Sequence, residues 1–131
     1  MSEGVSAEAI EKGWHKPSCP FCQRIAAGDV DHVYPKEGPL NTVRFPPLNP
    51  VVPGHMLFVP YAHVEHGPRW GLEVGVAMAW AESYAGGLMS DFNLITSSGP
   101  SATQTIDHVH IHYVPRRPGD GLHLPWTGQH S

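Results

Sequence analysis

Charged residues and long apolar runs are both scarce in this chain of 131 residues. Lys, Arg, Asp and Glu make up 15% of it, the formal net charge is −4 with histidine neutral, and no stretch is rich in Lys or Arg. Such a chain is unsuited to bulk binding of DNA or of an anionic membrane. Its longest apolar stretch is broken by Glu73, Gly75 and Glu82, well short of the ~20 residues of a membrane span. We therefore expect no DNA partner and no membrane span.

Cysteine is scarce as well, because the only two stand together in Cys19-Pro20-Phe21-Cys22. Residues 1–4 are polar and acidic, unlike the start of a secretory signal. These features predict a cytoplasmic protein, in which the two cysteines stay as thiols or bind a metal.

Proline and glycine are abundant, with fourteen of each, and they predict many turns between short elements. The length fits one domain, which we place at residues 18–131 after an N-terminal extension at 1–17. Ser6 is a candidate N-cap for a short helix that Gly13 ends, and Gly28 is expected to end a second one after Cys22. Strands are predicted at 32–34, 42–45, 55–60 and 92–96, with a hairpin turn at 35–39.

The main helix is predicted from about residue 69 to 85, with Gly86 and Gly87 as its stop. Its interior carries only Glu73 and Glu82 as charges, so it is apolar nearly all round. A helix of this kind has to be covered on both sides. In so small a domain, the second cover is expected to be another copy of the chain, which predicts a homodimer.

The most distinctive segment is His108-Val109-His110-Ile111-His112-Tyr113, in which three histidines alternate with apolar residues. On a strand, this spacing places the three imidazoles on one face, roughly 6–7 Å apart. Imidazole titrates near neutral pH, so a buried strand gains little stability from three such side chains. A purely structural role therefore explains the three histidines poorly. The row is therefore expected to bind a metal, to attack a substrate, or to do both.

Two further segments have to be considered beside this row. The Cys19–Cys22 pair suits either half of a zinc site or a dithiol redox centre, although the latter is expected after an apolar strand that residues 6–18 do not provide. The loop at 97–105 is rich in small polar residues, and its backbone N–H groups and hydroxyls suit a phosphate.

Together, these motifs resemble the histidine triad (HIT) family, in particular its small zinc-bearing bacterial members. The resemblance rests on the histidine row, on the upstream Pro53-Gly54-His55 with its strand, on His63, and on the Cys19–Cys22 pair. It implies an α+β fold with an antiparallel sheet of about five strands, one main helix and a short zinc-bound N-terminal segment. It also implies a homodimer.

In zinc-bearing members of the family the ligands are two cysteines and two histidines. The resemblance assigns a structural zinc to Cys19, Cys22, His63 and His108. Two thiolates and two imidazoles would close a tetrahedral site.

The resemblance further implies a hydrolase or transferase that attacks the α-phosphate of a nucleotide derivative, of phosphoramidate or dinucleoside polyphosphate type. His110 would be the nucleophile that forms a nucleotidyl-histidine intermediate, and His112 would lie beside the phosphate. The residues implied in substrate or phosphate binding are His55, Leu48, Ser97, Gln104 and Thr105.

Three positions depart from the family pattern, and two of them are Ser97, where the family commonly has Asn, and Thr103, where it usually has Gly. Pro47 stands where the family has an acidic or amide contact to ribose, and it offers no acceptor side chain. The alternative prediction is therefore a non-enzymatic, zinc-stabilised HIT-like module that binds a nucleotide or a protein.

Overall fold

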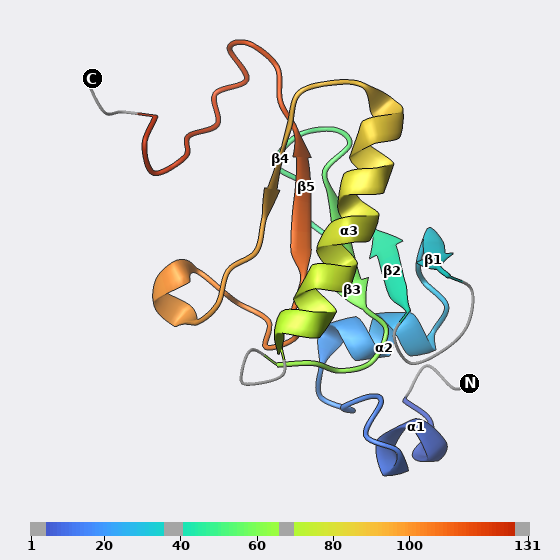
Figure 1. Cartoon of the computed structure of the whole chain (residues 1–131). Coiled ribbons are helices and arrows are strands. Elements are labelled where there is room, and N and C mark those ends of the chain that lie inside the picture. Colours follow the sequence, from blue (N-terminus) through green and yellow to red (C-terminus); the bar gives the residue numbers. More distant parts are fainter. Residues whose placement is uncertain (1–4, 36–40, 66–69, 128–131) are drawn as a thin grey trace.

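The computed structural model of the chain describes residues 5–35, 41–65 and 70–127. Within these ranges, five strands form one antiparallel sheet in the order β1-β2-β3-β5-β4 (Figure 1). The strands are β1 (His32–Tyr34), β2 (Thr42–Phe45), β3 (Met56–Pro60), β4 (Phe92–Ile95) and β5 (Ile111–Pro115). The helices are α1 (Ala7–Glu11), α2 (Pro20–Ala26) and α3 (Trp70–Leu88), with a 3₁₀ turn at Pro100–Ala102. The α+β fold with one main helix is thus confirmed.

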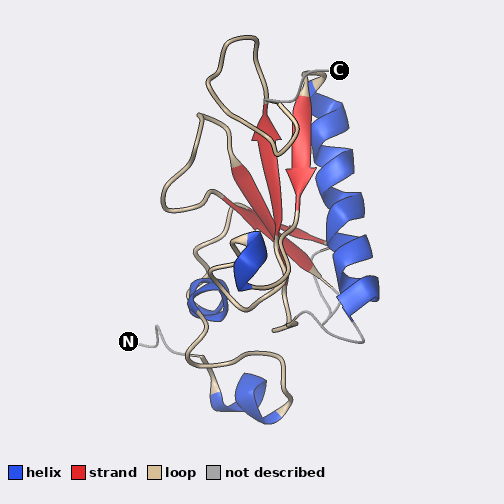
Figure 2. Ribbon diagram, turned by 90° about the vertical axis from the view of Figure 1, so that its left-hand side faces the viewer, coloured by secondary structure: helices blue, strands red, loops and turns tan. Residues whose placement is uncertain are grey.

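The sheet separates two apolar clusters. On one face, α3 packs Ala77, Ala81 and Ala85 against side chains that include Phe58 and Tyr113. On the opposite face lie α2 and several loops, as Figure 2 shows. There, the side chains that pack together are Phe21, Cys22, Ile25, Val43, Phe45, Leu57 and Val59. Because side chains alternate along a strand, β3 contributes Leu57 to one cluster and Phe58 to the other.

The short helices begin where local chemistry favours it. Ser6 caps α1 as predicted, since its hydroxyl accepts a hydrogen bond from the Ala9 N–H. α2 begins at Pro20, earlier than the sequence interpretation placed it, because proline fits the first turn and Cys19 Sγ accepts from the Cys22 N–H. The segment between these helices is held to the body of the protein by a hydrogen bond from His63 N to the Trp14 carbonyl. The boundary between extension and domain at residues 17/18 stays a prediction.

The prediction that Gly86 and Gly87 stop the main helix was wrong. α3 continues through both glycines to Leu88, and the chain leaves the helix at Met89, which has a positive φ of 55°. The glycines are exposed, while Ala81 and Ala85 on the packed side hold the helix against the sheet. Tertiary packing therefore outweighs the local helix cost of glycine. The predicted start of the main helix at residue 69 lies outside the described residues. The hairpin turn predicted at 35–39 lies outside them except for residue 35. No helix in the described ranges is long and apolar enough to cross a membrane.

Candidate functional site

The histidine row enters the sheet only in part. β5 begins at Ile111, so the prediction that all three histidines lie on one strand was wrong for His108 and His110. β5 pairs with β3 from Ile111 and with β4 from His112, whereas the Val109 N–H donates to the Val64 carbonyl in a loop. The alternation nevertheless persists. Val109, Ile111 and Tyr113 pack in the α3 cluster, which turns the imidazoles toward the other face.

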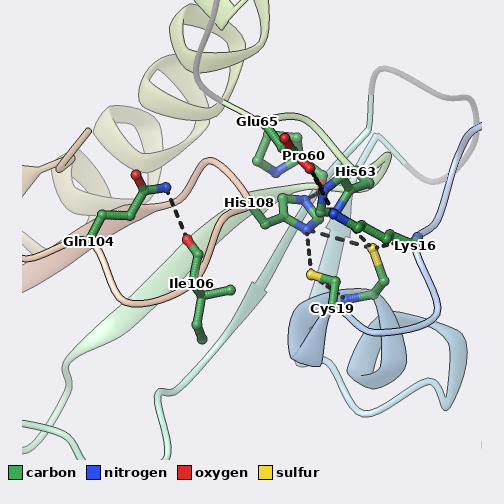
Figure 3. Close-up of polar contacts among 9 residues, drawn as sticks. Lys16, Cys19, Pro60, His63, Glu65, Gln104, Ile106 and His108 are labelled. Carbon is green, nitrogen blue, oxygen red and sulfur yellow. Dashed lines mark hydrogen bonds and ion pairs between the residues drawn. The ribbon is translucent and has the colours of Figure 1, made fainter. Parts of the chain in front are cut away.

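His108 belongs to a compact group with Cys19, Cys22 and His63. The ligand atoms of these four residues all lie within 4.8 Å of one another, and three of the four are buried. His108 Nδ1 lies 3.3 Å from Cys19 Sγ, and His63 Nδ1 lies 3.4 Å from Cys22 Sγ (Figure 3). The four residues predicted as zinc ligands are thus brought together from α2, the segment after β3 and the start of the histidine row.

The far nitrogen of each imidazole in this group is also held. His108 Nε2 lies 2.9 Å from the Pro60 carbonyl, which can only accept, so Nε2 carries the proton. His63 Nε2 lies 2.9 Å from a Glu65 carboxylate oxygen, and Glu65 in turn pairs with Lys16. Both Nδ1 lone pairs are therefore directed at the sulfurs, as a metal site requires.

The electrostatics of the two thiols favour deprotonation of one of them. The contact with Cys22, and then the nearby His108 and His63, lower the pKa of Cys19 far below its usual value, while the same contact raises the pKa of Cys22. The pKa of His63 is raised, first by its hydrogen bond with Cys19 and further by Glu65. Two sulfurs and two oriented imidazoles in one buried cluster form a donor set that fits Zn²⁺.

His110 lies next to this group but faces a different space. Its Nδ1 lies 2.7 Å from the His108 carbonyl, which can only accept, so Nδ1 carries a proton. The Phe21 ring contacts the His110 ring edge-on, with centroids 5.1 Å apart, and Thr96 Oγ1 donates to the His110 carbonyl. His110 is only 6% exposed, which fixes the ring orientation.

His112 and His55 form a hydrogen-bonded pair whose direction can be assigned. The Val51 N–H donates to His55 Nδ1, so His55 carries its proton on Nε2 and donates it to His112 Nδ1, at 2.9 Å. The remaining proton of His112 is then on Nε2. Burial, with the neighbouring His110 and His55, lowers the pKa of His112 to about 4, and burial also lowers the pKa of His55. Both imidazoles are therefore neutral at pH 7.

His55, His110 and His112 open onto a cavity of about 460 Å³, which we call the first cavity. Among the described residues, it is also lined by three of the predicted binding residues: Leu48, Ser97 and Thr105. Leu48 stands at its edge and is 87% exposed. Pro47 lines the same wall, next to Asn49.

Gln104 is the one predicted binding residue that does not line the first cavity. Its Oε1 accepts from the Gly99 N–H and its Nε2 donates to the Ile106 carbonyl. Figure 3 shows this second contact beside the cysteine–histidine group. Gln104 therefore braces the loop that carries Ser97 and Thr105.

Three residues with a clear place at the site were missed from the sequence. Phe21 and Arg24 line the first cavity because α2, starting at Pro20, presents them three positions apart on one side. Glu65 orients His63 from two residues away. The period-two spacing of His63 and Glu65 was a usable signal, whereas the Arg24 contact depended on the unforeseen start of α2.

Comparison with known proteins identifies relatives of the whole arrangement. A family model described as HIT domain matches residues 41–119. "Protein hit" from Bacillus subtilis is 30% identical over 118 residues, which cover 83% of this chain and 79% of the relative. A structure titled as a Zn-bound histidine triad family protein from Mycobacterium smegmatis is 29% identical, with a TM-score of 0.60 over 81% of this chain and 80% of that one. SMU.412c from Streptococcus mutans shares the fold at 24% identity, with a TM-score of 0.67 over 91% of this chain and 78% of that one.

Proposed function

Since this chain belongs to the HIT domain family, we propose that it is a hydrolase or transferase acting on a phosphorus-linked nucleotide derivative. The single observation that carries this proposal is that two neighbouring imidazoles carry their protons on opposite ring nitrogens. His110 carries a proton on Nδ1 and His112 carries one on Nε2, and both residues line the first cavity. A nucleophile and a hydrogen-bond donor side by side are the groups that substitution at phosphorus needs.

In the first step, His110 Nε2 attacks the α-phosphorus. A new N–P bond forms, and the bond from phosphorus to the leaving group breaks, with its electron pair departing on the leaving atom. The Nδ1–H bond to the His108 carbonyl stabilises the positive charge that develops on His110. His112 Nε2–H donates a hydrogen bond to the charge that develops on the phosphoryl and leaving atoms.

In the second step, water attacks the nucleotidyl-histidine. An O–P bond forms, the N–P bond breaks, and its electron pair returns to His110 Nε2. One proton of the water stays with the product phosphate, and the other neutralises the leaving group through solvent. A different acceptor in place of water makes the same reaction a transfer.

The first cavity suits the nucleotide half of such a substrate. Leu48 and Leu57 offer apolar surface to a base, while Ser97 and Thr105 offer hydroxyls on the side of the histidines. Asn49 is the amide that stands closest in sequence to Pro47, and it lines the same cavity. We assign the ribose contact to Asn49, because Pro47 has no polar side-chain atom.

The cysteine–histidine group is proposed as a structural zinc site, with Cys19, Cys22, His63 and His108 as ligands. Its donor set and its burial support this assignment, and a relative of the same fold is described as Zn-bound. Zinc bound there would tie α2 to the start of the histidine row, and no step of the reaction uses it. A reducing compartment such as the cytoplasm would keep both thiols free to bind it.

A homodimer is proposed on the outer side of α3. Leu72 is 62% exposed there, and Val76 is only partly buried by its own chain. Exposed apolar side chains on a helix favour a partner surface. A mass in solution near twice 14.3 kDa at micromolar concentration is expected, and a monomeric mass would contradict the proposal.

The decisive experiment replaces the nucleophile. His110→Ala should lower the turnover of a nucleoside phosphoramidate or a dinucleoside polyphosphate by at least about 10³-fold, since it removes the attacking atom. The variant should keep the circular dichroism spectrum and the zinc content of the wild type, because the His108 side chain is untouched. Equal turnover by wild type and variant would refute the proposed mechanism.

The open wall of the first cavity favours a second candidate, a non-enzymatic module that binds a nucleotide or a protein. Pro47 offers no ribose acceptor, and Leu48 is largely exposed beside it. This candidate predicts that a panel of nucleotides binds the wild type without any turnover, and that His110→Ala binds them equally well.

A further inference from the structure

A second cavity adjoins the first one, with a volume of about 260 Å³. The two cavities share Val51, His55, Ser97, Thr103 and His112, whereas His110 lines only the first. His112, the residue proposed to contact the leaving group, is therefore one of the five residues that line both cavities.

The floor of the second cavity is the continuation of the histidine row. Val114 and Arg116 follow His112 at alternate positions of the chain, and Asn93 and Ile95 of β4 pair with Val114 and His112. Because alternate residues of a strand share a face, the second cavity lies on the same face of the sheet as His110. A substrate held at phosphorus by His110 can thus extend over His112 into it.

The outer wall comes from the chain beyond β5, which turns back on the β4 side of the sheet (Figure 1). Leu122, His123 and Leu124 line the cavity from there. These residues lie outside the 41–119 match to the HIT domain, so the wall is a feature of this chain's own C-terminal segment.

A salt bridge holds this segment in place. Arg116 Nε and Nη2 donate to the two carboxylate oxygens of Asp120, at 2.7 and 3.0 Å, and Nη2 also donates to the Leu122 carbonyl. Arg116 Nη1 donates to Asn93 Oδ1, which ties the same guanidinium to β4. The Asp120 side chain is only 7% exposed and accepts the N–H of Leu122 as well.

The charges decide what this space suits. Among the described Lys, Arg, Asp and Glu residues, only Arg24 and Arg116 line the two cavities. Arg24 pairs with Asp29 and donates to the Pro46 carbonyl, and Arg116 pairs with Asp120. A further phosphate group in the second cavity would therefore meet no unpaired Lys or Arg among these residues. Val51, Ile95, Val114, Leu122 and Leu124 offer it an apolar lining instead.

From this geometry we propose that the second cavity is a binding site for the leaving group, and that it takes an uncharged apolar or aromatic body rather than a polyphosphate. This inference rests on the proposed function, because it takes His110 as the group that holds the phosphorus. The volume, below the roughly 300–1,000 Å³ of pockets for whole drug-sized ligands, suits one ring. Leu124 and the Arg116–Asp120 pair are then determinants of specificity.

The test measures binding by calorimetry in the zinc-loaded His110→Ala variant, which cannot turn the probes over. The probes are the N-methyl and N-benzyl phosphoramidates of AMP, which carry equal charge and differ only in the ring. AMP and ADP form the second pair, which differs by one phosphate. The N-methyl and N-benzyl phosphoramidates without a nucleoside form the third.

We expect the benzyl group to tighten binding about five- to tenfold in both amidate pairs, from the apolar area that it buries. ADP should bind no more than about twofold tighter than AMP, since, among the described residues, no unpaired Lys or Arg lines the second cavity to contact its second phosphate. We call the tighter binding of the benzyl over the methyl amidate the benzyl gain. Introducing Leu124→Ala or Asp120→Asn into the His110→Ala variant should remove most of this benzyl gain and leave the AMP affinity unchanged. Ile10→Ala, which shortens an exposed aliphatic side chain of α1, should leave the benzyl gain intact.

The outcomes separate this inference from the proposed function. If AMP fails to bind while the benzyl gain persists in the pair without a nucleoside, the nucleotide assignment fails and the second cavity stands. If AMP binds without any benzyl gain, or if the gain survives both Leu124→Ala and Asp120→Asn, the leaving-group site is refuted. A preference for ADP over AMP larger than the benzyl gain would also refute it.

Discussion

At the scale of single residues, the histidine row divides its members by hydrogen-bond partner. His108, His110 and His112 have the same side chain and nearly the same spacing. The carbonyls of Pro60 and His108 each accept from one imidazole, and the third imidazole accepts from His55. Each ring therefore presents a different nitrogen and a different proton state to its surroundings. The chemical difference between the three imidazoles therefore follows from their hydrogen-bond partners rather than from the residue type.

The depressed pKa of His112 gives a pH dependence of stability. The pKa is about 4 in the folded chain and 6.5 for an unperturbed histidine, so below pH 6.5 the unfolded chain takes up a proton that the folded chain refuses. The free energy of unfolding therefore keeps its full value, as far as His112 is concerned, above about pH 6.5. It falls progressively as the pH is lowered toward 4. Urea unfolding at a series of pH values should show a shallower loss for His112→Asn than for the wild type.

His123→Asn provides the matched control for this measurement, because it removes an exposed histidine and leaves the His55–His112 pair intact. Its stability should follow the wild-type pH curve more closely than that of His112→Asn. Identical pH curves for wild type and His112→Asn would mean that the His112 imidazole is not desolvated.

At the same scale, the sequence could predict which residues gather but not how they are oriented. The resemblance to the HIT family, rather than spacing alone, was what predicted that four donors and three cavity histidines come together. The tautomers of His55 and His112 could not be foreseen, because they follow from the backbone N–H of Val51, which donates to His55 and carries no side-chain signal. Gln104 is the counterexample, since its amide is used within its own loop.

At the scale of elements, the ends of helices and strands were the least predictable features. β5 starts later than the alternation indicated, because its neighbours β3 and β4 offer partners only from Ile111 and His112 onward. α3 ends later than its glycines indicated, because one packed side is enough to continue it. In both cases a tertiary contact outweighed a local signal.

The glycines of α3 lead to a prediction about stability. Gly86 is exposed, and a Cβ built on it would meet no atom within 4 Å. Gly86→Ala should therefore raise the free energy of unfolding by about 0.5–1 kcal/mol, by lowering the entropy that the chain loses on folding. Chemical denaturation of the two proteins gives this difference directly.

Gly54→Ala is the contrasting substitution, because Gly54 has a φ of +91° and its Cβ would lie 3.2 Å from Pro115 Cγ. It should lower the free energy of unfolding by about 1 kcal/mol or more. If both substitutions had the same sign, backbone conformation would not be the deciding factor at these positions.

At the scale of the whole molecule, the sheet acts as a partition. The α3 cluster fills one face, and the cysteine–histidine group and both cavities lie on the other. The fold class was implied by the resemblance to the HIT family, and the order of most elements followed from sequence patterns. The second cavity did not, because the segment that walls it has no periodic pattern and depends on the Arg116–Asp120 pair.

The proposed zinc site is expected to contribute to the stability of the whole chain. Protein expressed with zinc should contain about one ion per chain, and removal of the ion by a chelator should cost at least about 3 kcal/mol of unfolding free energy. Cys22→Ser should lose the metal, since it removes a buried thiol of the group. His55→Ala, which removes an imidazole outside the group, should retain it.

Elemental analysis and thermal unfolding with and without a chelator check these expectations. Zinc content equal in wild type and Cys22→Ser would contradict the ligand assignment. An absence of stoichiometric metal in protein produced with zinc would contradict the site itself.

The histidine row has one consequence for mutational tolerance. A strand at the surface of a protein usually alternates between positions that accept substitution and positions that do not. From residue 108 to 113 no such alternation is available: His108, Val109, His110, Ile111 and Tyr113 are at most 6% exposed, and His112 lines both cavities. Apolar positions face the α3 cluster, and the intervening ones face the first cavity or the thiols. We therefore expect single substitutions in these six consecutive residues to be tolerated less well than substitutions in exposed segments of the chain.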